Sequence, residues 1–304
     1  MSIVVGVAPG HGSAGAVRLG ALLARSYDRE LVVVAVNSVG WPPGYSNVDA
    51  EYQRFLEEQA QLVLDEAKRH VPADIPARYL IHGASSARRG LLEVCEAEDA
   101  HRLVIGAADV ASEGEIALGS VGLGLLQGAD LPVAIAPRGY DVDPAARLAR
   151  ATAAYSGSET SAELVLGAAR VTAVSGAALR VAAFHTRPRA FVAANVSLRA
   201  EDEVLQEWER VIRERLDRVL DEVEALAPAP SSVSLVFGSG SDWHAALRAV
   251  PWEAAEVLLV GSSSLGPIAR ISLGSHAAKI IRSSPVPVVM VPRRATGEYV
   301  AGVV

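Results

Sequence analysis

Two glycine–serine pairs in this chain occur where backbone amides could hold an anion. Gly119-Ser120 and Gly274-Ser275 each stand 13 residues after a glycine that ends an apolar run, LVIG at 103–106 and LLVG at 258–261. A helix that begins at Gly-Ser presents its first N–H groups and the serine hydroxyl to a phosphate oxygen. The pattern predicts a nucleotide-type site in each half of the chain.

The same residues also have a purely structural interpretation. Gly106 and Gly261 could simply close a turn, while Ser120 and Ser275 cap the helices that follow them. Repetition of the whole pattern 155 residues apart favours the binding interpretation for the ancestral unit. It does not by itself establish that both halves still bind.

The repeat extends through almost the whole chain. Segments 3–24, 31–36 and 80–83 match 151–172, 179–184 and 235–238. The offset is 148 residues in the first two matches and 155 in the third, so the second half holds seven extra residues between its second and third strands. This pattern is typical of a duplicated domain with one loop or helix extension. We predict domains at residues 1–140 and 147–293, joined by the polar segment 138–147.

Each half alternates short apolar runs with longer amphipathic patterns. The first half predicts strands 2–8, 31–37, 77–82, 102–106 and 132–136, with helices 13–27, 49–70, 86–98 and 119–129 between them. In the second half, one helix carries the apolar stripe Val204, Trp208, Val211, Ile212, Leu216, Val219, Leu220 and Val223. Alternating strands and helices imply a parallel sheet covered on both faces. The predicted fold is therefore α/β, with two tandem flavodoxin-like domains, each a five-stranded parallel sheet.

Composition restricts the class of protein. Half of the 304 residues are hydrophobic, which is enough for a core in each half, and the net charge of −7 disfavours nucleic-acid binding. No apolar run approaches the roughly 20 residues that a membrane helix needs, and the N-terminal sequence lacks a signal-peptide pattern. Cys95 is the single cysteine, which fits a reducing cytoplasm. The four tryptophans and Cys95 are expected to pack in or near the core.

In its glycine–serine motif, the chain resembles the universal stress protein family, as a tandem two-domain member. ATP-binding members carry glycine, two residues, glycine, nine residues and Gly-Ser or Gly-Thr. Here the spacing is kept in both halves, but Asp109 and Ser264 replace the middle glycine. The resemblance implies an adenine nucleotide alpha hydrolase-like fold. It also implies that the last strands, within 132–137 and 285–292, pair with each other.

The resemblance further assigns the nucleoside end of each site. The family's first strand usually ends in an aspartate that holds the nucleoside, and those positions are Ala8 and Ser156 here. The adenine contact at the end of the second strand falls on the backbone of Val36 and Phe184.

The substitutions leave the second half better equipped to bind. Asp109 places a carboxylate near where the phosphates would lie, with Glu113 and Glu115 on the same loop. In the second half, Arg270 offers a positive charge, with a solvated loop residue as its alternative interpretation, and His276 offers a further donor. We therefore expect ATP or AMP, with Mg²⁺ accompanying the nucleotide, to bind mainly in the second domain and weakly or not at all in the first.

No residue is obviously placed as a general base, so the expected function is a cytoplasmic stress-response or regulatory protein and not an enzyme. The alternative is a nucleotide-free structural or partner-binding paralogue with decayed sites, and assembly into a homodimer is left open. The glycines of 10–15 match a dinucleotide-binding fingerprint, but Val36-Asn37 supplies no acidic residue for a ribose. The histidines show no metal-ligand spacing, although His82 and His185 end apolar strands where a site could lie.

Overall fold

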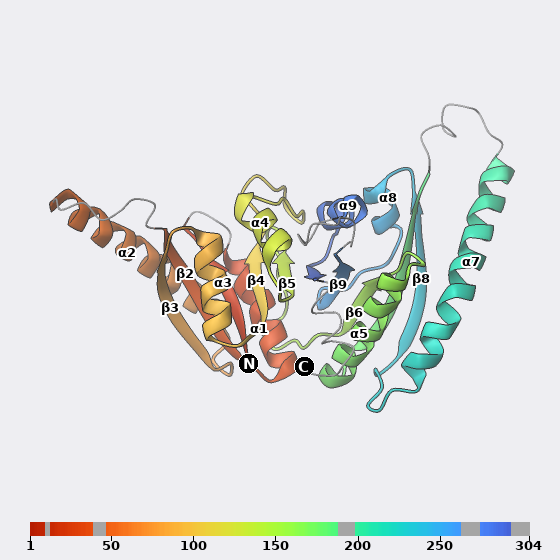
Figure 1. The fold of residues 1–304 in the computed structure, drawn as a ribbon, viewed down its shortest axis with the longest axis horizontal. Coiled ribbons are helices and arrows are strands. Elements are labelled where there is room, and N and C mark those ends of the chain that lie inside the picture. The colour runs from red at the N-terminus through yellow and green to blue at the C-terminus, as the bar shows by residue number, and fades with distance from the viewer. Residues whose placement is uncertain (10–12, 39–46, 188–197, 263–273, 293–304) are drawn as a thin grey trace.

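The computed structural model describes residues 1–9, 13–38, 47–187, 198–262 and 274–292, and it joins both halves in one ten-stranded sheet (Figure 1). The strands are β1 (Ser2–Val7), β2 (Glu30–Ser38), β3 (Ala77–Ala84), β4 (Ala100–Gly106), β5 (Val133–Ala136), β6 (Arg150–Ala154), β7 (Ala178–Thr186), β8 (Val233–Gly240), β9 (Glu256–Gly261) and β10 (Val288–Val291). Their order across the sheet is β3-β2-β1-β4-β5-β10-β9-β6-β7-β8. Each half is a parallel five-stranded unit, which confirms the predicted α/β fold.

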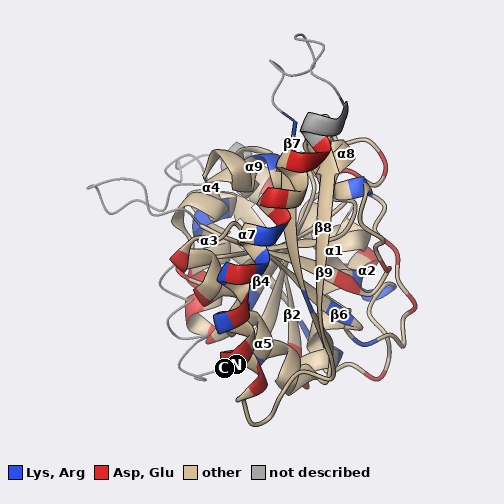
Figure 2. Ribbon diagram, turned by 90° about the vertical axis from the view of Figure 1, so that its right-hand side faces the viewer, with Lys and Arg blue, Asp and Glu red and all other residues tan. Residues whose placement is uncertain are grey.

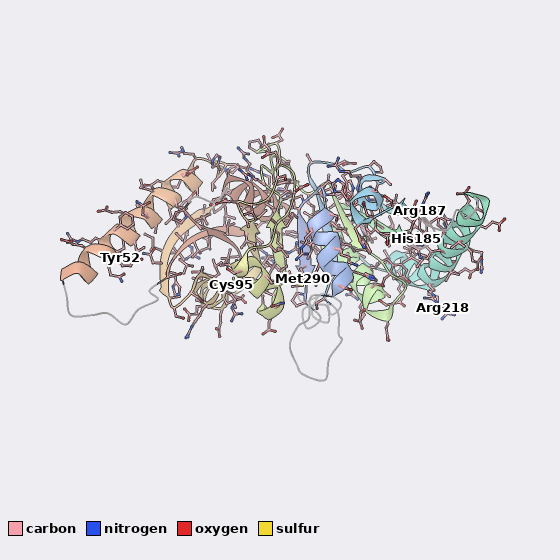
Figure 3. All side chains as sticks on the ribbon, turned by 90° about the horizontal axis from the view of Figure 1, so that it is seen from above. Tyr52, Cys95, His185, Arg187, Arg218 and Met290 are labelled. Carbon is pink, nitrogen blue, oxygen red and sulfur yellow. The ribbon has the colours of Figure 1, made fainter. Side chains whose placement is uncertain are left out.

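The two halves meet through their last strands. β5 and β10 run antiparallel, with Ala134 opposite Val289 and Val133 opposite Met290, whereas the other strand pairs are parallel. Met290 accordingly lies near the middle of the molecule (Figure 3). Both last strands are fully buried because each also pairs with a second strand and is covered on both faces. The pairing predicted within one chain is confirmed.

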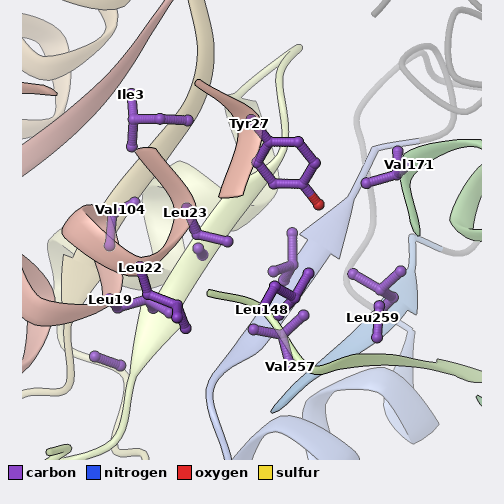
Figure 4. Packing of buried hydrophobic residues seen from close by; sticks show 14 of the residues in the cluster. Ile3, Leu19, Leu22, Leu23, Tyr27, Val104, Leu148, Val171, Val257 and Leu259 are labelled. Atoms are coloured by element: carbon purple, nitrogen blue, oxygen red, sulfur yellow. The ribbon is translucent and has the colours of Figure 1, made fainter. Parts of the chain in front are cut away.

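The hydrophobic core continues across this junction. Alternate residues of each strand point to opposite faces of the sheet, so Ala134 and Val289 contribute to one cluster, while Val133 and Met290 contribute to the other. Each cluster contains residues of both halves, as the packing of side chains from either half in Figure 4 illustrates. The halves therefore share their cores instead of burying two separate ones.

The helices cover the two faces of the sheet in matched sets. They are α1 (Ser13–Tyr27), α2 (Asn47–Lys68), α3 (Ala87–Ala97), α4 (Ser120–Gly128), α5 (Glu159–Ser175), α7 (Leu198–Glu224), α8 (Trp243–Arg248) and α9 (Ser275–Ser283). Side chains of α1, α2, α5 and α7 enter one core cluster. Those of α3, α4, α8 and α9 enter the other, so both faces are covered as expected.

Six of the eight positions in the apolar stripe predicted for α7 belong to a core cluster or pack against it: Trp208, Ile212, Leu216, Val219, Leu220 and Val223. Ile212, Leu216 and Val223 are buried against the sheet, and the opposite face of the helix carries acidic and basic residues (Figure 2). Val204, at the start of the stripe, is 56% exposed. Helical periodicity cannot show how far the sheet extends beneath the end of a helix.

A buried charge cluster lies at the amino end of the second half's strands. The side chain of Glu256 has no exposed surface and pairs with Arg180 (Nη2–Oε1 2.5 Å) and Arg150 (Nη2–Oε2 2.8 Å). Thr152 donates its hydroxyl to Glu256 and accepts a bond from Arg180 Nε at 2.9 Å. Each carboxylate oxygen is therefore satisfied, which is what a buried charge requires.

Replacing Glu256 by glutamine is expected to lower the free energy of unfolding by about 3 kcal/mol, because Arg180 would stay buried without its counter-charge. Urea denaturation followed by circular dichroism measures the loss. Glu253→Gln is the matched control, since Glu253 also pairs with Arg150 but is 55% exposed, and it should cost less than about 1 kcal/mol. Equal losses in the two variants would contradict the special role of the buried carboxylate.

Candidate functional site

Within the described residues, each half has a cavity at the carboxyl edge of the sheet. Each cavity lies beside the carboxyl end of the first strand of its half, β1 or β6. In the sheet, β1 lies between β2 and β4, and β6 lies between β7 and β9, so the strand order switches direction at both positions. This is where open α/β sheets bind ligands. The cavity volumes are about 360 Å³ in the first half and about 590 Å³ in the second, both within the usual range for small-molecule pockets.

The structure brings most of the residues predicted from the sequence to these cavities. The first is lined by Ala8, Val36, Gly106, Gly119 and Ser120, among others. The second is lined by Ser156, Phe184, Gly261, Gly274 and Ser275, among others. Asp109 is an exposed loop residue outside the lining of the first cavity. Ser264 and Arg270 lie outside the described residues.

The starts of α4 and α9, which lie at the cavities, show whether Ser120 and Ser275 are capping residues. Gly119 and Gly274, not the serines, are the N-cap residues of α4 and α9, and neither helix start has a side-chain cap bond. The interpretation of Ser120 and Ser275 as capping residues was therefore wrong. Both are the first residues of their helices and both are exposed. The positive ends of the two helix dipoles consequently face the cavities.

A serine that the sequence analysis did not single out fixes the end of the first strand in each half. Ser161 Oγ accepts bonds from the backbone N–H of Ser156 (3.2 Å) and Ser158 (3.1 Å). Ser13, its counterpart at the offset of 148, accepts from Ala8 N–H at 3.4 Å. The signal was present in the sequence, since the serine is identical in the two aligned segments.

The second cavity has aromatic walls. Trp208 lies against His185, with ring centroids 5.2 Å apart, and Trp243 lies against His276 at 5.4 Å. All four residues line the cavity, so packing against the core does not fully describe these tryptophans. Burial, with the charge of Arg187, lowers the pKa of His185, which keeps this imidazole neutral at neutral pH. Figure 3 shows His185 and Arg187 in the second half of the molecule.

The loop between β4 and α4 is held against the segment that follows β5. Arg138 donates through Nη1 to the carbonyl oxygens of Asp109 (2.5 Å) and Ala111 (2.9 Å). Its backbone N–H donates to Glu115 O, and its own carbonyl accepts from Gly114 N–H. The guanidinium is thus used within the loop and does not line the cavity.

Other residues considered in the sequence have structural surroundings. His82 Nε2 lies 2.9 Å from Glu93 Oε2 and lines neither cavity. Gly15 lies in α1, and its Cα faces Tyr140. The other glycines of the dinucleotide-binding fingerprint, at 10 and 12, lie outside the described residues. Burial raises the pKa of Cys95 to about 12, so this thiol is not a reactive nucleophile.

Comparison with known proteins agrees with this geometry. The family model described as "Universal stress protein family" matches residues 1–137 and 149–292. Universal stress proteins of Mycobacterium tuberculosis and Mycobacterium bovis are each 34% identical to this chain over 296 residues, covering 96% of it and 100% of their own length. The chain belongs to the universal stress protein family.

Solved structures agree on the fold. The crystal structure of a universal stress protein from Archaeoglobus fulgidus superimposes with a TM-score of 0.61 at 21% identity, covering 96% of this chain and 98% of that one. A functionally unknown protein from Pseudomonas aeruginosa gives a TM-score of 0.53 at 12% identity, covering 99% and 96%. Within the described residues, no helix is long and apolar enough to cross a membrane. Over the same residues, no group of three or more histidine, cysteine or acidic side chains could hold a metal ion.

Ser161→Ala is expected to lower the free energy of unfolding by about 1 kcal/mol, because the N–H groups of Ser156 and Ser158 lose their acceptor at the start of α5. Thermal and urea denaturation measure the change. Thr160→Ala is the neighbouring control, since that hydroxyl contacts only Ser158 Oγ among the described contacts, and it should have little effect. If the two variants lose the same stability, Ser161 does not fix this loop.

Proposed function

We propose that this protein binds an adenine nucleotide, ATP or AMP, in the cavity of its second half and holds it without significant turnover. The observation that carries the proposal is that groups suited to each part of a nucleotide line the same cavity. An uncapped helix N-terminus, a group of hydroxyls and several aromatic rings line one space of about 590 Å³. A nucleotide has a matching anionic end, ribose and flat base.

The phosphates are assigned to the start of α9. Gly274 brings the backbone to the cavity without a side chain, and the hydroxyl of Ser275 and the imidazole of His276 line the same space. Amides at a helix N-terminus attract an anion, and the effect is larger in a partly closed site than in open solvent. Arg270, outside the described residues, is proposed to add the cationic contact.

The nucleoside is assigned to the hydroxyl and aromatic walls. Ser156 follows β6, Ser158 is the N-cap residue of α5, and both line the cavity with their hydroxyl oxygens 3.0 Å apart, so we assign the ribose to this pair. Phe184, Trp208 and Trp243 supply ring faces for the base. Stacking of a base on an aromatic side chain contributes about 1–3 kcal/mol in proteins that bind single-stranded nucleic acids.

The lining supports binding more than hydrolysis. Among the described residues, no aspartate or glutamate lines the second cavity, so a carboxylate to activate water or hold Mg²⁺ is absent from that part of the wall. A Mg²⁺ ion would arrive with the nucleotide and be held chiefly by its phosphates. These groups fit a cytoplasmic regulatory protein of the stress response. In such a protein, the bound nucleotide changes the surface offered to a partner and is not itself converted to product.

Two substitutions in the first half partly support a second candidate function, that of a nucleotide-free protein. Ala8 stands where Ser156 stands in the other half, and Asp109 replaces a glycine near the phosphate region. A protein with no nucleotide in either site would act as a structural or partner-binding paralogue. The polar lining of the second cavity makes this the less favoured function for the whole chain.

Isothermal titration of ATP and AMP with Mg²⁺ tests the proposal. One nucleotide per chain is expected, with a Kd in the micromolar range. Gly274→Glu should weaken binding by about 100-fold, because a fixed carboxylate would occupy the helix N-terminus and repel the phosphates. Gly119→Glu, the same change in the first half, should leave the affinity unchanged. Millimolar or undetectable binding to the unaltered protein would instead support the nucleotide-free function.

The role of Arg270 has a separate test. Arg270→Ala should weaken ATP by about tenfold and AMP by less, because the larger phosphate chain gains more from a cation. The same titrations measure both. An unchanged ATP affinity would remove Arg270 from the site while leaving the assignment to Gly274 and Ser275 intact.

A further inference from the structure

We propose that the cavity of the first half is a separate site for an uncharged, mainly apolar small molecule. The duplication has kept the shape of the site and changed its chemistry. Gly106, Gly119 and Ser120 still line a cavity of about 360 Å³ beside β1, so the space has not collapsed. The side chains that surround it no longer suit an anion.

Matched positions show the change directly. At the repeat offsets, Ser156 corresponds to Ala8 and His276 to Val121, and both replacements line the first cavity. Phe184 corresponds to Val36, which also lines it. At the first two of these positions, a group able to hydrogen-bond with a nucleotide has become a methyl or isopropyl group.

The rest of the lining is also apolar. Leu91, Ile105 and Leu118 add aliphatic surface, and among the described lining residues only Ser13 and Ser120 carry a polar side chain. Ser13 already contacts the backbone of Ala8, which leaves Ser120 as the exposed hydroxyl of this wall. A buried aliphatic surface of this kind binds apolar groups and supplies few partners for polar ones.

The described lining of the cavity offers no positive charge to a nucleotide. No Lys, Arg or His side chain is among the described residues that line it. Arg138, which holds the loop between β4 and α4, is bonded to two carbonyl oxygens, and Asp109, Glu113 and Glu115 are exposed on that loop. A polyphosphate entering this cavity would lose hydration, and among the described lining residues it would find no cation, so that the start of α4 would have to compensate. A neutral ligand does not incur this cost.

The neutral dye N-phenyl-1-naphthylamine, which fluoresces in apolar surroundings, is the probe for this site. Titration into the full chain should show saturable binding of one dye per chain that excess ATP with Mg²⁺ does not displace. Gly119→Leu should weaken dye binding by at least about tenfold, because a Cβ at this position has only Ala108 nearby, at 3.5 Å, and the longer side chain would fill the cavity. Gly274→Leu, the matched change in the second half, should leave dye binding unchanged.

Circular dichroism establishes that the variants are folded, and Ala8→Leu provides a second way to fill the same cavity should Gly119→Leu be unstable. Three results would overturn the proposal: absence of saturable dye binding, displacement of the dye by ATP, or its loss in Gly274→Leu but not in the first-half variants. Loss of an ATP equivalent in Gly119→Leu would also overturn it. Failure of ATP to bind anywhere would refute the proposed nucleotide function and leave the dye result standing.

Discussion

The antiparallel pairing of β5 with β10 is the contact on which the rest of this structure depends. It turns two five-stranded parallel units into one ten-stranded sheet and joins the core clusters of both faces into continuous layers. Since both strands would otherwise be exposed apolar edges, the pairing also removes the surfaces most prone to aggregation. It fixes the two cavities within one rigid framework, each at the carboxyl edge of its own half.

Within that framework the two halves show what duplication allows. Their backbones still place a strand-ending glycine and a Gly-Ser helix start beside the first strand, and Ser13 and Ser161 hold that strand end in the same way. The side chains facing the cavities have diverged. Because backbone geometry depends on the common core, whereas cavity side chains contribute little to it, the lining can change while the fold is kept.

The same divergence is seen far from the cavities. The buried cluster around Glu256 belongs to the second half alone, since His101 and Val4 occupy the places of Glu256 and Thr152 in the first. Stability and ligand chemistry have therefore both become specific to each half, which makes matched substitutions in the two halves informative.

The sequence by itself determined the α/β class, the duplication and the first half's element boundaries to within two residues, because hydrophobic periodicity and glycine–serine spacing are local signals. The two-residue differences are at the end of β3, at the start of β4 and at both ends of α2. Only the tertiary structure decided which side chains meet at the carboxyl edge. Trp208 and Trp243 come from distant elements, and sequence patterns could not separate a cavity wall from a core position. The same limit explains Val204 and the N-cap roles of Gly119 and Gly274, since exposure and hydrogen bonding depend on neighbours that are remote in the chain.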